Sequence, residues 1–228
     1  MLSITKAMNN LELDFIIKVG GSLLKNINQC KSLVDVIIEA GKSYKLLLFP
    51  GGGEIDNYIE AYHQQVPLDR EIFHRATMLS MDQTALLFSN YNLNKLVPIN
   101  NLIDCKKVLA DGKIPVLLPS QIVFGLDPFR YTNRITSDGM ALYFGHILQV
   151  KRMVVLKSIN GILDRDQKII SRLTFDEFIN IEQDCVDESF PLLASKAKIP
   201  IDIVNGLEHE QLRTFFREGT NEWGTRID

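Results

Sequence analysis

Short apolar runs alternate with longer amphipathic stretches along most of this chain, and this alternation restricts the possible folds more than any other feature. We expect buried strands at residues 13–19, 45–49, 114–118, 152–156 and 201–204. We expect helices at residues 28–40, 70–90, 138–149, 175–181, 188–197 and 208–218. Strands that alternate with helices are typical of a mainly parallel sheet with helices on both faces. The sequence therefore predicts an α/β protein.

Two local signals add detail to this prediction. Thr174 is followed three residues later by Glu177, and this spacing is typical of a capping box at the start of a helix. The polar residues 164–167 stand between short apolar segments, so we expect a hairpin turn and some antiparallel pairing there. Because no repeat, low-complexity tract or linker marks a boundary, we expect a single domain.

The charge and the cysteines limit the classes of partner. A net charge of −3, with no long cluster of lysines and arginines, disfavours binding to nucleic acid or to an anionic membrane. No apolar stretch reaches the ~18 residues that span a bilayer, and residues 1–10 lack the apolar core of a secretory signal. Cys30, Cys105 and Cys185 are far apart and form no C-x-x-C pair, which indicates neither a disulfide framework nor a zinc site. We therefore expect a cytoplasmic protein with small-molecule partners.

The first glycine-rich segment follows the run 13–19. Lys18 stands near the end of that run, and Gly20, Gly21 and Ser22 come directly after it. Glycines allow backbone N–H groups to approach an anion closely, and a lysine adds a point charge, so this pattern is suited to phosphate oxygens. A strand-ending turn with a solvated lysine is the simpler explanation of such a motif when it stands alone.

The second glycine-rich segment consists of Gly51, Gly52 and Gly53, between the run 45–49 and a helical segment that begins near Glu54. Three consecutive glycines cost conformational entropy on folding, which a simple connection rarely requires. Close approach of the backbone to an anionic ligand, with a helix N-terminus behind it, explains them better than a flexible loop does.

The third segment is Ser137, Asp138 and Gly139, ahead of an apolar helical stretch. Either Ser137 or Asp138 could cap that helix. Alternatively, the carboxylate of Asp138 could orient lysines in a phosphate site without touching the phosphate. All three segments stand after strands or at helix starts, on the edge of the sheet where open α/β proteins bind ligands. We therefore expect one site that holds the terminal phosphates of a nucleotide beside an acceptor.

The motifs K-x-G-G-S-L, P-G-G-G and T-S-D-G-x-A, followed by a late strand and N-G, occur in this order over nearly the whole chain. In this respect the chain resembles the amino acid kinase family. The resemblance implies a three-layer α/β/α sandwich with a mainly parallel sheet of about eight strands. It also implies an acceptor-binding half at about residues 1–130, a nucleotide-binding half at about residues 131–228, the use of ATP with Mg²⁺, and a homo-oligomer.

The resemblance implies roles for individual residues as well. Catalysis falls to Lys18, Asp138 and a second lysine, ATP binding to Gly20, Gly21, Ser22, Ser137, Asn160, Gly161 and Asp164, and acceptor binding to Gly51, Gly52, Gly53 and Arg75. No residue is assigned to a metal. The second lysine is either Lys157 or Lys196, and we favour Lys157 because it stands at the end of a predicted strand on the ligand edge.

Residues 74–83 resemble more narrowly the kinases of methanofuran biosynthesis, which phosphorylate an aminomethylfuran methyl phosphate to the diphosphate. Two segments depart from the family pattern. Residues 157–161 read K-S-I-N-G where many relatives read T-D-V-D-G, so Ser158 and Asn160 replace acidic residues. Residues 186–189 stand where acetylglutamate kinases have a glycine-glycine-methionine segment with a downstream lysine.

These patterns predict an ATP-dependent kinase that transfers the γ-phosphoryl group to a phosphate or carboxylate of a small anionic acceptor, with aminomethylfuran methyl phosphate as one candidate. Isopentenyl phosphate, UMP and amino acids are alternative acceptors. Because Ser158 and Asn160 replace acids, a non-catalytic ligand-binding, storage or regulatory protein of the same fold is the main alternative function. A dinucleotide-binding Rossmann enzyme is disfavoured, since no G-x-G-x-x-G follows the first strand.

Overall fold

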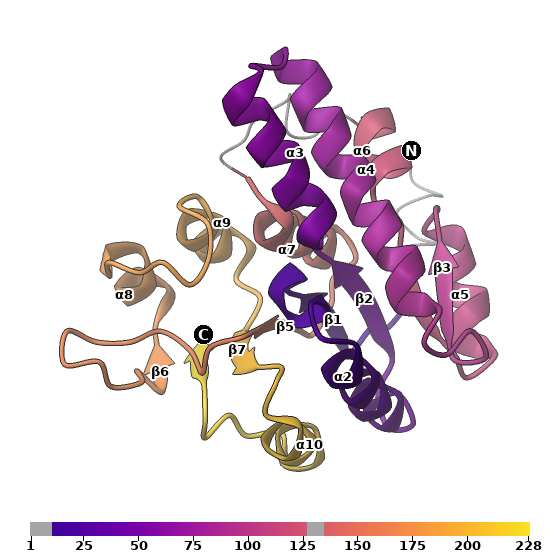
Figure 1. Cartoon of the computed structure of the whole chain (residues 1–228). Helices are drawn as coiled ribbons and strands as arrows, with labels where there is room; N and C mark the ends of the chain where they lie inside the picture. The colour runs from indigo at the N-terminus through magenta and orange to yellow at the C-terminus, as the bar shows by residue number, and fades with distance from the viewer. Residues whose placement is uncertain (1–10, 127–134) are drawn as a thin grey trace.

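The computed structural model of the chain describes residues 11–126 and 135–228. Residues 1–10 and the expected boundary between the two halves of the chain, near residue 130, lie outside the described residues. The strands form one eight-stranded sheet in the order β3-β4-β2-β1-β5-β7-β8-β6 (Figure 1). Their bounds are Phe15–Val19 for β1, Leu46–Pro50 for β2, Leu96–Ile99 for β3, Ile114–Leu117 for β4, Arg152–Lys157 for β5, Arg172–Leu173 for β6, Ile201–Asn205 for β7 and Thr225–Ile227 for β8.

All but two of these strands run in the same direction. β1 pairs in parallel with β2 and β5, β4 pairs in parallel with β2 and β3, and β5 pairs in parallel with β7. β8 is antiparallel to β7, and β6 pairs in parallel with β8. This arrangement confirms the predicted mainly parallel sheet. Because β1 lies between β2 and β5, the segments that follow these three strands meet at one edge of the sheet.

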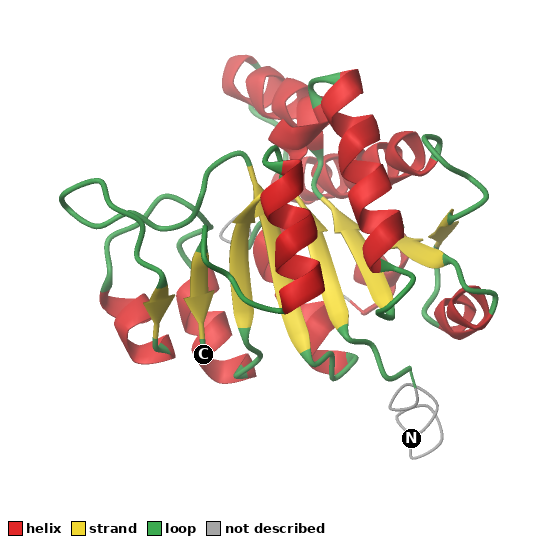
Figure 2. Ribbon diagram, turned by 90° about the horizontal axis from the view of Figure 1, so that it is seen from below, coloured by secondary structure: helices red, strands yellow, loops and turns green. Residues whose placement is uncertain are grey.

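Helices cover both faces of the sheet (Figure 2). One face packs against α5 (Ile103–Ala110), α6 (Ser120–Leu126), α7 (Ser137–Ile147), α8 (Phe175–Asn180) and α9 (Phe190–Ala197), and the other packs against α2 (Ile27–Ala40) and α10 (His209–Glu218). Side chains alternate between the two faces along a strand, so that Ile16 of β1 joins the first core and Ile17 joins the second. Since both faces are covered, β1, β2 and β7 are buried along their whole length, which explains why most of their residues are apolar.

Two helices extend beyond the carboxyl edge of the sheet. α3 (Gly53–Gln65) starts directly after β2, and α4 (Arg70–Ser89) packs against it (Figure 1). The short 3-10 helix η1 (Gly21–Leu24) follows β1 and also contacts α3. Met78 of α4 belongs to the first core and Phe88 to the second, so this helix is anchored on both sides of the sheet. α3 and α4 therefore form a wall beside the ends of β1 and β2.

The strands and helices that the sequence predicts are all present, with ends within two residues of their expected positions. The capping box is confirmed, because Thr174 Oγ1 accepts from the Glu177 N–H and the Glu177 carboxylate accepts from the Thr174 N–H. A bridge between Leu163 and Ile169 confirms the hairpin. The sequence did not predict β3, β6, α5 or α6. β3 is a short edge strand that contains Pro98, and β6 has two residues, so neither has the apolar run of a buried strand.

The three cysteines are buried free thiols, at positions Cys30, Cys105 and Cys185. Burial raises the pKa of Cys105 to about 12, so this thiol stays protonated and contributes to packing. Within the two described ranges, no helix combines the length and the apolar character that a membrane crossing requires.

Candidate active site

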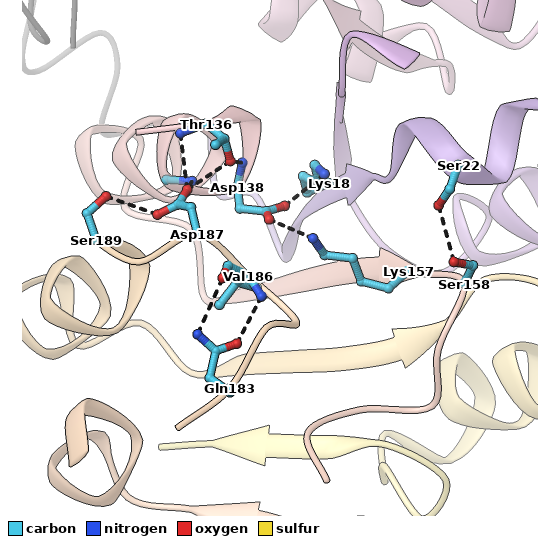
Figure 3. A network of polar contacts seen from close by, with 11 residues as sticks. Lys18, Ser22, Thr136, Asp138, Lys157, Ser158, Gln183, Val186, Asp187 and Ser189 are labelled. Carbon is cyan, nitrogen blue, oxygen red and sulfur yellow. Dashed lines mark hydrogen bonds and ion pairs between the residues drawn. The ribbon is translucent and has the colours of Figure 1, made fainter. Parts of the chain in front are cut away.

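A buried carboxylate lies between two lysines at the carboxyl edge of the sheet (Figure 3). Lys18 belongs to β1, Lys157 ends the neighbouring strand β5, and Asp138 is in the first turn of α7. The Lys18 Nζ atom lies 2.8 Å from Asp138 Oδ1, and Lys157 Nζ donates to Asp138 Oδ2 at 2.6 Å. Lys18 and Asp138 are only 4% and 3% exposed. Lys196, the other candidate for the second lysine, is exposed on α9.

The charges of this cluster are coupled. Burial by itself would raise the pKa of Asp138, but the ammonium groups of Lys18 and Lys157 and their hydrogen bonds hold that pKa below its usual range. Burial lowers the pKa of Lys18 below its usual value. The Asp138 carboxylate raises this pKa, and the charge of Lys157 lowers it further. One ionised carboxylate beside two ammonium groups leaves one net positive charge, which favours a polyanion such as a triphosphate.

Asp138 can reach the lysines because other residues cap α7. Thr136 is the N-cap, and the carboxylate of Asp187 accepts from the Thr136 N–H at 3.1 Å, from the Thr136 hydroxyl at 2.9 Å and from the Gly139 N–H at 3.2 Å. The alternatives in which Ser137 or Asp138 caps this helix are therefore wrong. A carboxylate from a distant segment satisfies the helix N-terminus, and this leaves the Asp138 side chain for the lysines.

The first two glycine segments contact each other through their backbones. A Cβ atom on Gly21 would lie 2.6 Å from the Cα atom of Gly53, and a Cβ atom on Gly20 would lie 2.7 Å from the carbonyl oxygen of Leu156. Gly53 has a φ of +62°, which residues with side chains rarely adopt. Close packing around these loops therefore requires glycine at these positions. Because glycine has no side chain, nothing separates the loop backbone from a ligand.

A cavity of about 210 Å³ lies between these loops, and we call it the glycine-loop cavity. Its lining comes from the loops, from α3 and from the start of α7, namely Gly21, Ser22, Lys25, Gly51, Gly52, Gly53, Asp56, Asn57 and Ser137. Glycine-loop N–H groups and helix N-termini are suited to bind anions. The predicted residues Ser22, Ser137 and the second glycine segment thus share one cavity.

A second cavity of about 90 Å³, which we call the helix cavity, lies between α3, α4 and the start of α7. Its apolar lining consists of Phe73, Met78, Met81, Ile135 and Met140, and its other lining residues are Gly52, Asp56, Glu60, Arg70, His74, Thr77, Thr136 and Ser137. Gly52, Asp56 and Ser137 also line the glycine-loop cavity. The two cavities therefore adjoin at these three residues.

Side chains near the end of β5 form neutral polar pairs. Ser22 Oγ donates to Ser158 Oγ at 3.3 Å (Figure 3), and Asn205 Nδ2 donates to Asn160 Oδ1 at 2.7 Å. The two positions at which the sequence replaces acidic residues, Ser158 and Asn160, are therefore both engaged in hydrogen bonds. The first of these pairs connects the loop after β1 with the loop after β5.

Three residues that the sequence assigns to the site have conformations or contacts that are explained without a ligand. Gly161 has a φ of +144°, which explains the glycine by its backbone conformation. The carboxylate of Asp164 accepts from backbone N–H groups inside the hairpin turn. Arg75 pairs with Glu71 at 2.9 Å, lies over the ring of Phe124 and lines neither cavity. The structure does not bring Arg75 together with the other predicted acceptor-binding residues.

The sequence analysis missed three carboxylates of the site. Asp56 and Glu60 stand four residues apart on α3 and so share one face of the helix, a spacing that follows directly after the second glycine segment. Asp187 belongs to the segment 186–189, which departs from the family pattern. No local signal shows that Asp187 reaches the start of α7, because that contact joins two distant parts of the chain.

The donor groups of the site fit phosphate oxygens better than a metal held by protein alone. Among residues 11–126 and 135–228, no group of three or more His, Cys, Asp or Glu side chains could hold a metal ion. Mg²⁺ in kinase sites is usually bound by one or two carboxylates together with substrate phosphates. A divalent cation at this site would therefore need oxygens from a bound phosphate in addition to protein carboxylates.

Comparisons with known proteins agree with this geometry. Residues 15–205 match the family model described as the amino acid kinase family. The chain is 28% identical over 215 residues to the (5-(aminomethyl)furan-3-yl)methyl phosphate kinase of Methanocaldococcus jannaschii, a match that covers 93% of this chain and 96% of that relative. It is 34% identical over 74 residues to the acetylglutamate kinase of Nitratidesulfovibrio vulgaris, covering 32% of this chain and 23% of that relative.

Solved structures share the fold at low sequence identity. The uridylate kinase from Archaeoglobus fulgidus superposes with a TM-score of 0.75 and 14% identity, covering 95% of this chain and all of that one. The UMP kinase from Bacillus anthracis superposes with a TM-score of 0.75 and 18% identity, covering 94% of this chain and 95% of that one. These similarities confirm the predicted three-layer α/β/α fold.

Proposed function

Since this chain belongs to the amino acid kinase family, we propose that it is an ATP-dependent kinase that transfers the γ-phosphoryl group to a phosphate or carboxylate oxygen of a small acceptor. The observation that carries this proposal is the pair of lysines, Lys18 and Lys157, held on one buried carboxylate beside two glycine loops. Phosphoryl transfer requires little covalent chemistry from a protein, so catalysis depends on positioning and charge stabilisation. A site of this composition can supply both.

In the proposed reaction an acceptor oxygen attacks the γ-phosphorus in line with the bridging oxygen of ATP. The new P–O bond forms as the bond to the bridging oxygen breaks, and ADP leaves with the electron pair. Lys18 and Lys157 stabilise the equatorial oxygens, over which the transition-state charge is spread. A phosphate or carboxylate oxygen is already ionised near neutral pH, so the reaction requires no general base.

The nucleotide has a defined place in this proposal. The ATP phosphates lie in the glycine-loop cavity against Gly20, Gly21 and Ser22, and the rest of the nucleotide lies near residues 157–161. The presence of Gly21, Gly51, Gly52 and Gly53 in the lining of this cavity supports the placement, because glycine backbone can approach phosphate oxygens closely. Mg²⁺ bound to the phosphates would add charge neutralisation. Asp138 keeps both lysines oriented toward the same space.

For the acceptor we propose an aminomethylfuran methyl phosphate, which the reaction converts to the diphosphate. Residues 74–83, the segment with the narrower resemblance, contribute His74, Thr77, Met78 and Met81 to the lining of the helix cavity. The similarity to the Methanocaldococcus jannaschii kinase over most of both chains supports the same acceptor. The helix cavity would hold the ring, and the glycine segment 51–53 would hold the acceptor phosphate beside the γ-phosphate.

We also propose that the protein is a cytoplasmic homo-oligomer. Leu79, Leu86 and Leu87 on α4 are 47%, 50% and 65% exposed. Exposed apolar side chains that gather on one element support an interface between copies of the chain. A monomer in light scattering at micromolar concentration would contradict this part of the proposal.

The kinase proposal is tested by measuring ADP release from ATP in the presence of aminomethylfuran methyl phosphate, isopentenyl phosphate, UMP, aspartate and acetylglutamate. We expect acceptor-dependent release with the first compound. Release with another member of the panel would keep the kinase and replace the acceptor. Binding of ATP by calorimetry without release for any acceptor would support the non-catalytic alternative instead.

A further inference from the structure

The geometry points to Asp56 and Glu60 on α3 as the residues that select an acceptor with a positively charged amino group. This inference rests on the proposed kinase function and goes beyond it, because it assigns the ammonium-binding group of the acceptor site. Both carboxylates line the helix cavity, and Asp56 also lines the glycine-loop cavity. An acceptor that extends between the two cavities therefore passes these side chains.

The hydrogen bonds and ion pairs around the two carboxylates support this assignment. Asp56 accepts one hydrogen bond, from Ser80 Oγ at 3.3 Å. Within the part of the chain that the structure describes, neither Asp56 nor Glu60 forms an ion pair. Lys18 and Lys157 are already paired with Asp138, and Lys25, which lines the glycine-loop cavity, is paired with Glu54. A cavity with two carboxylates that have no partner cation is suited to a ligand that brings one.

The remaining wall of the helix cavity defines the rest of the acceptor. Phe73, Met78, Met81 and Met140 provide apolar surface opposite in character to the carboxylates. Aromatic rings and methionine thioethers pack well against a flat ring. The chemical class is a small ring with an ammonium group and, toward the glycine loops, a phosphate.

The raised pKa of Asp56 agrees with a role in binding an ammonium group. Burial, followed by the charge of Glu60, raises the pKa of Asp56 to about 6, while Ser80 and Lys18 act in the opposite direction. A carboxylate that is held without a cation in a partly buried cavity is destabilising for the folded protein. A bound ammonium group would relieve this cost, since an opposite charge favours the ionised form.

Acceptors without an ammonium group gain nothing from these residues. A second carboxylate on the acceptor, as in an acyl amino acid, would be repelled by the charges of Asp56 and Glu60. A neutral base such as uracil would leave both carboxylates desolvated without a partner. The charge of α3 therefore discriminates among the acceptors that the glycine loops and Lys18 by themselves would accept.

The test compares two acceptors that differ only in this group, aminomethylfuran methyl phosphate and its hydroxymethyl analogue. We expect wild-type kcat/KM to be about 100-fold higher for the amine. In Asp56→Asn the KM for the amine should rise about 10-fold, and more in the double variant with Glu60→Gln, while the values for the hydroxymethyl analogue change less than about twofold. The asparagine still accepts from Ser80, which preserves the local hydrogen bond.

Controls separate this inference from general effects of charge or folding. Asp35→Asn removes an exposed carboxylate on α2 and should leave the KM for both acceptors unchanged. Circular dichroism checks that each variant is folded, and the KM for ATP checks the nucleotide site. Equal kcat/KM values for the two acceptors in the wild-type protein, or equal losses for both in Asp56→Asn, would overturn the inference and leave the kinase intact.

A protein without phosphoryl transfer would also give a clear answer. If no acceptor in the panel supports ADP release, the proposed function is wrong, and calorimetry with aminomethylfuran methyl phosphate decides the inference separately. Binding that Asp56→Asn weakens about 10-fold, with the hydroxymethyl analogue unaffected, would support ammonium recognition. Binding that is equal in the wild type and the variant would overturn it.

Discussion

Two buried carboxylates at opposite ends of the strands have the same charge pattern and different surroundings. Asp138 lies between Lys18 and Lys157 at the carboxyl edge of the sheet. Asp202, near the start of β7, lies between Arg152 at the start of β5 and Arg226 of β8. Each carboxylate thus joins two cations from separate elements.

The two clusters differ in how firmly their cations are held. Arg152 also donates to the Gly219 carbonyl at 3.0 Å and lies over the ring of Phe215, at 5.3 Å from its centroid. The guanidinium of Arg226 also donates to the Asp228 carboxylate at 3.1 Å. Guanidinium groups with several fixed partners make a rigid structural contact.

Lys18 and Lys157, at the carboxyl edge of the sheet, have hydrogen-bond donors that are not used within the described part of the protein. Among the described residues, neither Lys18 nor Lys157 has a hydrogen bond or ion pair with a group other than Asp138. An ammonium group has three donors, so each lysine retains two for ligand oxygens. A buried ion cluster is thus a candidate ligand site when its cations are lysines that retain hydrogen-bond donors without a protein partner.

The largest effect on kcat is expected for Lys18→Met, in the cluster around Asp138. Loss of this ammonium group should lower kcat about 10³-fold with a small change in the KM for ATP, because its charge interacts most strongly with the transferring group. Steady-state kinetics with ATP and the active acceptor measures the effect. Wild-type turnover in a folded Lys18→Met protein would remove Lys18 from catalysis.

Asp138→Asn is expected to have the next largest effect. Without the carboxylate the two ammonium groups repel each other and lose their common orientation, so kcat should fall about 10²-fold. Single-turnover kinetics separates this loss from slow product release. A variant with reduced stability and normal kcat would mean that Asp138 has only a structural role.

Arg152→Met tests the opposite cluster. Removal of one partner should leave Asp202 buried with less compensation and lower the free energy of unfolding by about 3 kcal/mol. Urea denaturation measures the stability, and kcat per folded molecule should stay close to the wild-type value. A large loss of kcat in the folded variant would show that the two clusters are not functionally separate.

The smallest effect concerns a third carboxylate, Asp56, which forms no ion pair among the described residues. Its folded-state pKa of about 6 lies above the ordinary value of 3.8, so the group supports the folded state fully below about pH 4 and loses this contribution as the pH rises through 6. Asparagine does not ionise, so Asp56→Asn should gain about 1 kcal/mol relative to the wild type between pH 4 and pH 8. This value is smaller than the full shift implies, because the side chain is partly exposed.

Urea denaturation of both proteins between pH 4 and pH 8 checks this sign. The difference between the two proteins cancels the titration of groups that both retain and that do not interact with Asp56. A stability difference that is constant with pH, or one that favours the wild type at high pH, would contradict the prediction. Such a gain in stability with a loss in amine selectivity is the expected signature of a binding residue.

Much of the fold and part of the site could be predicted from the sequence. β1 and β2 are buried on both faces, so their residues are apolar except for Lys18, and the glycines after them mark backbone that approaches another group closely. Lys18 was identifiable because a charge inside such a run is costly without a role. Edge strand β3 and the two-residue strand β6 lacked a comparable local signal.

The second lysine and the helix cap needed the assembled sheet. The sequence left Lys157 and Lys196 as alternatives, and strand order alone placed the end of β5 beside β1 and brought Lys157 to Asp138. Likewise, the sequence left Ser137 or Asp138 as possible caps of α7, and the contacts of Asp187, from a distant segment, with Thr136 and Gly139 leave the Asp138 side chain for the lysines.

Local sequence patterns were sufficient to predict the α/β class, the buried strands and the positions of the glycine loops, because burial and backbone conformation depend on neighbouring residues along the chain. The assembled sheet was needed to show which charges meet, namely two lysines on Asp138 and two carboxylates of α3 beside an apolar wall. Electrostatic pairing depends on distance in space, and the order of parallel strands in the sheet sets that distance.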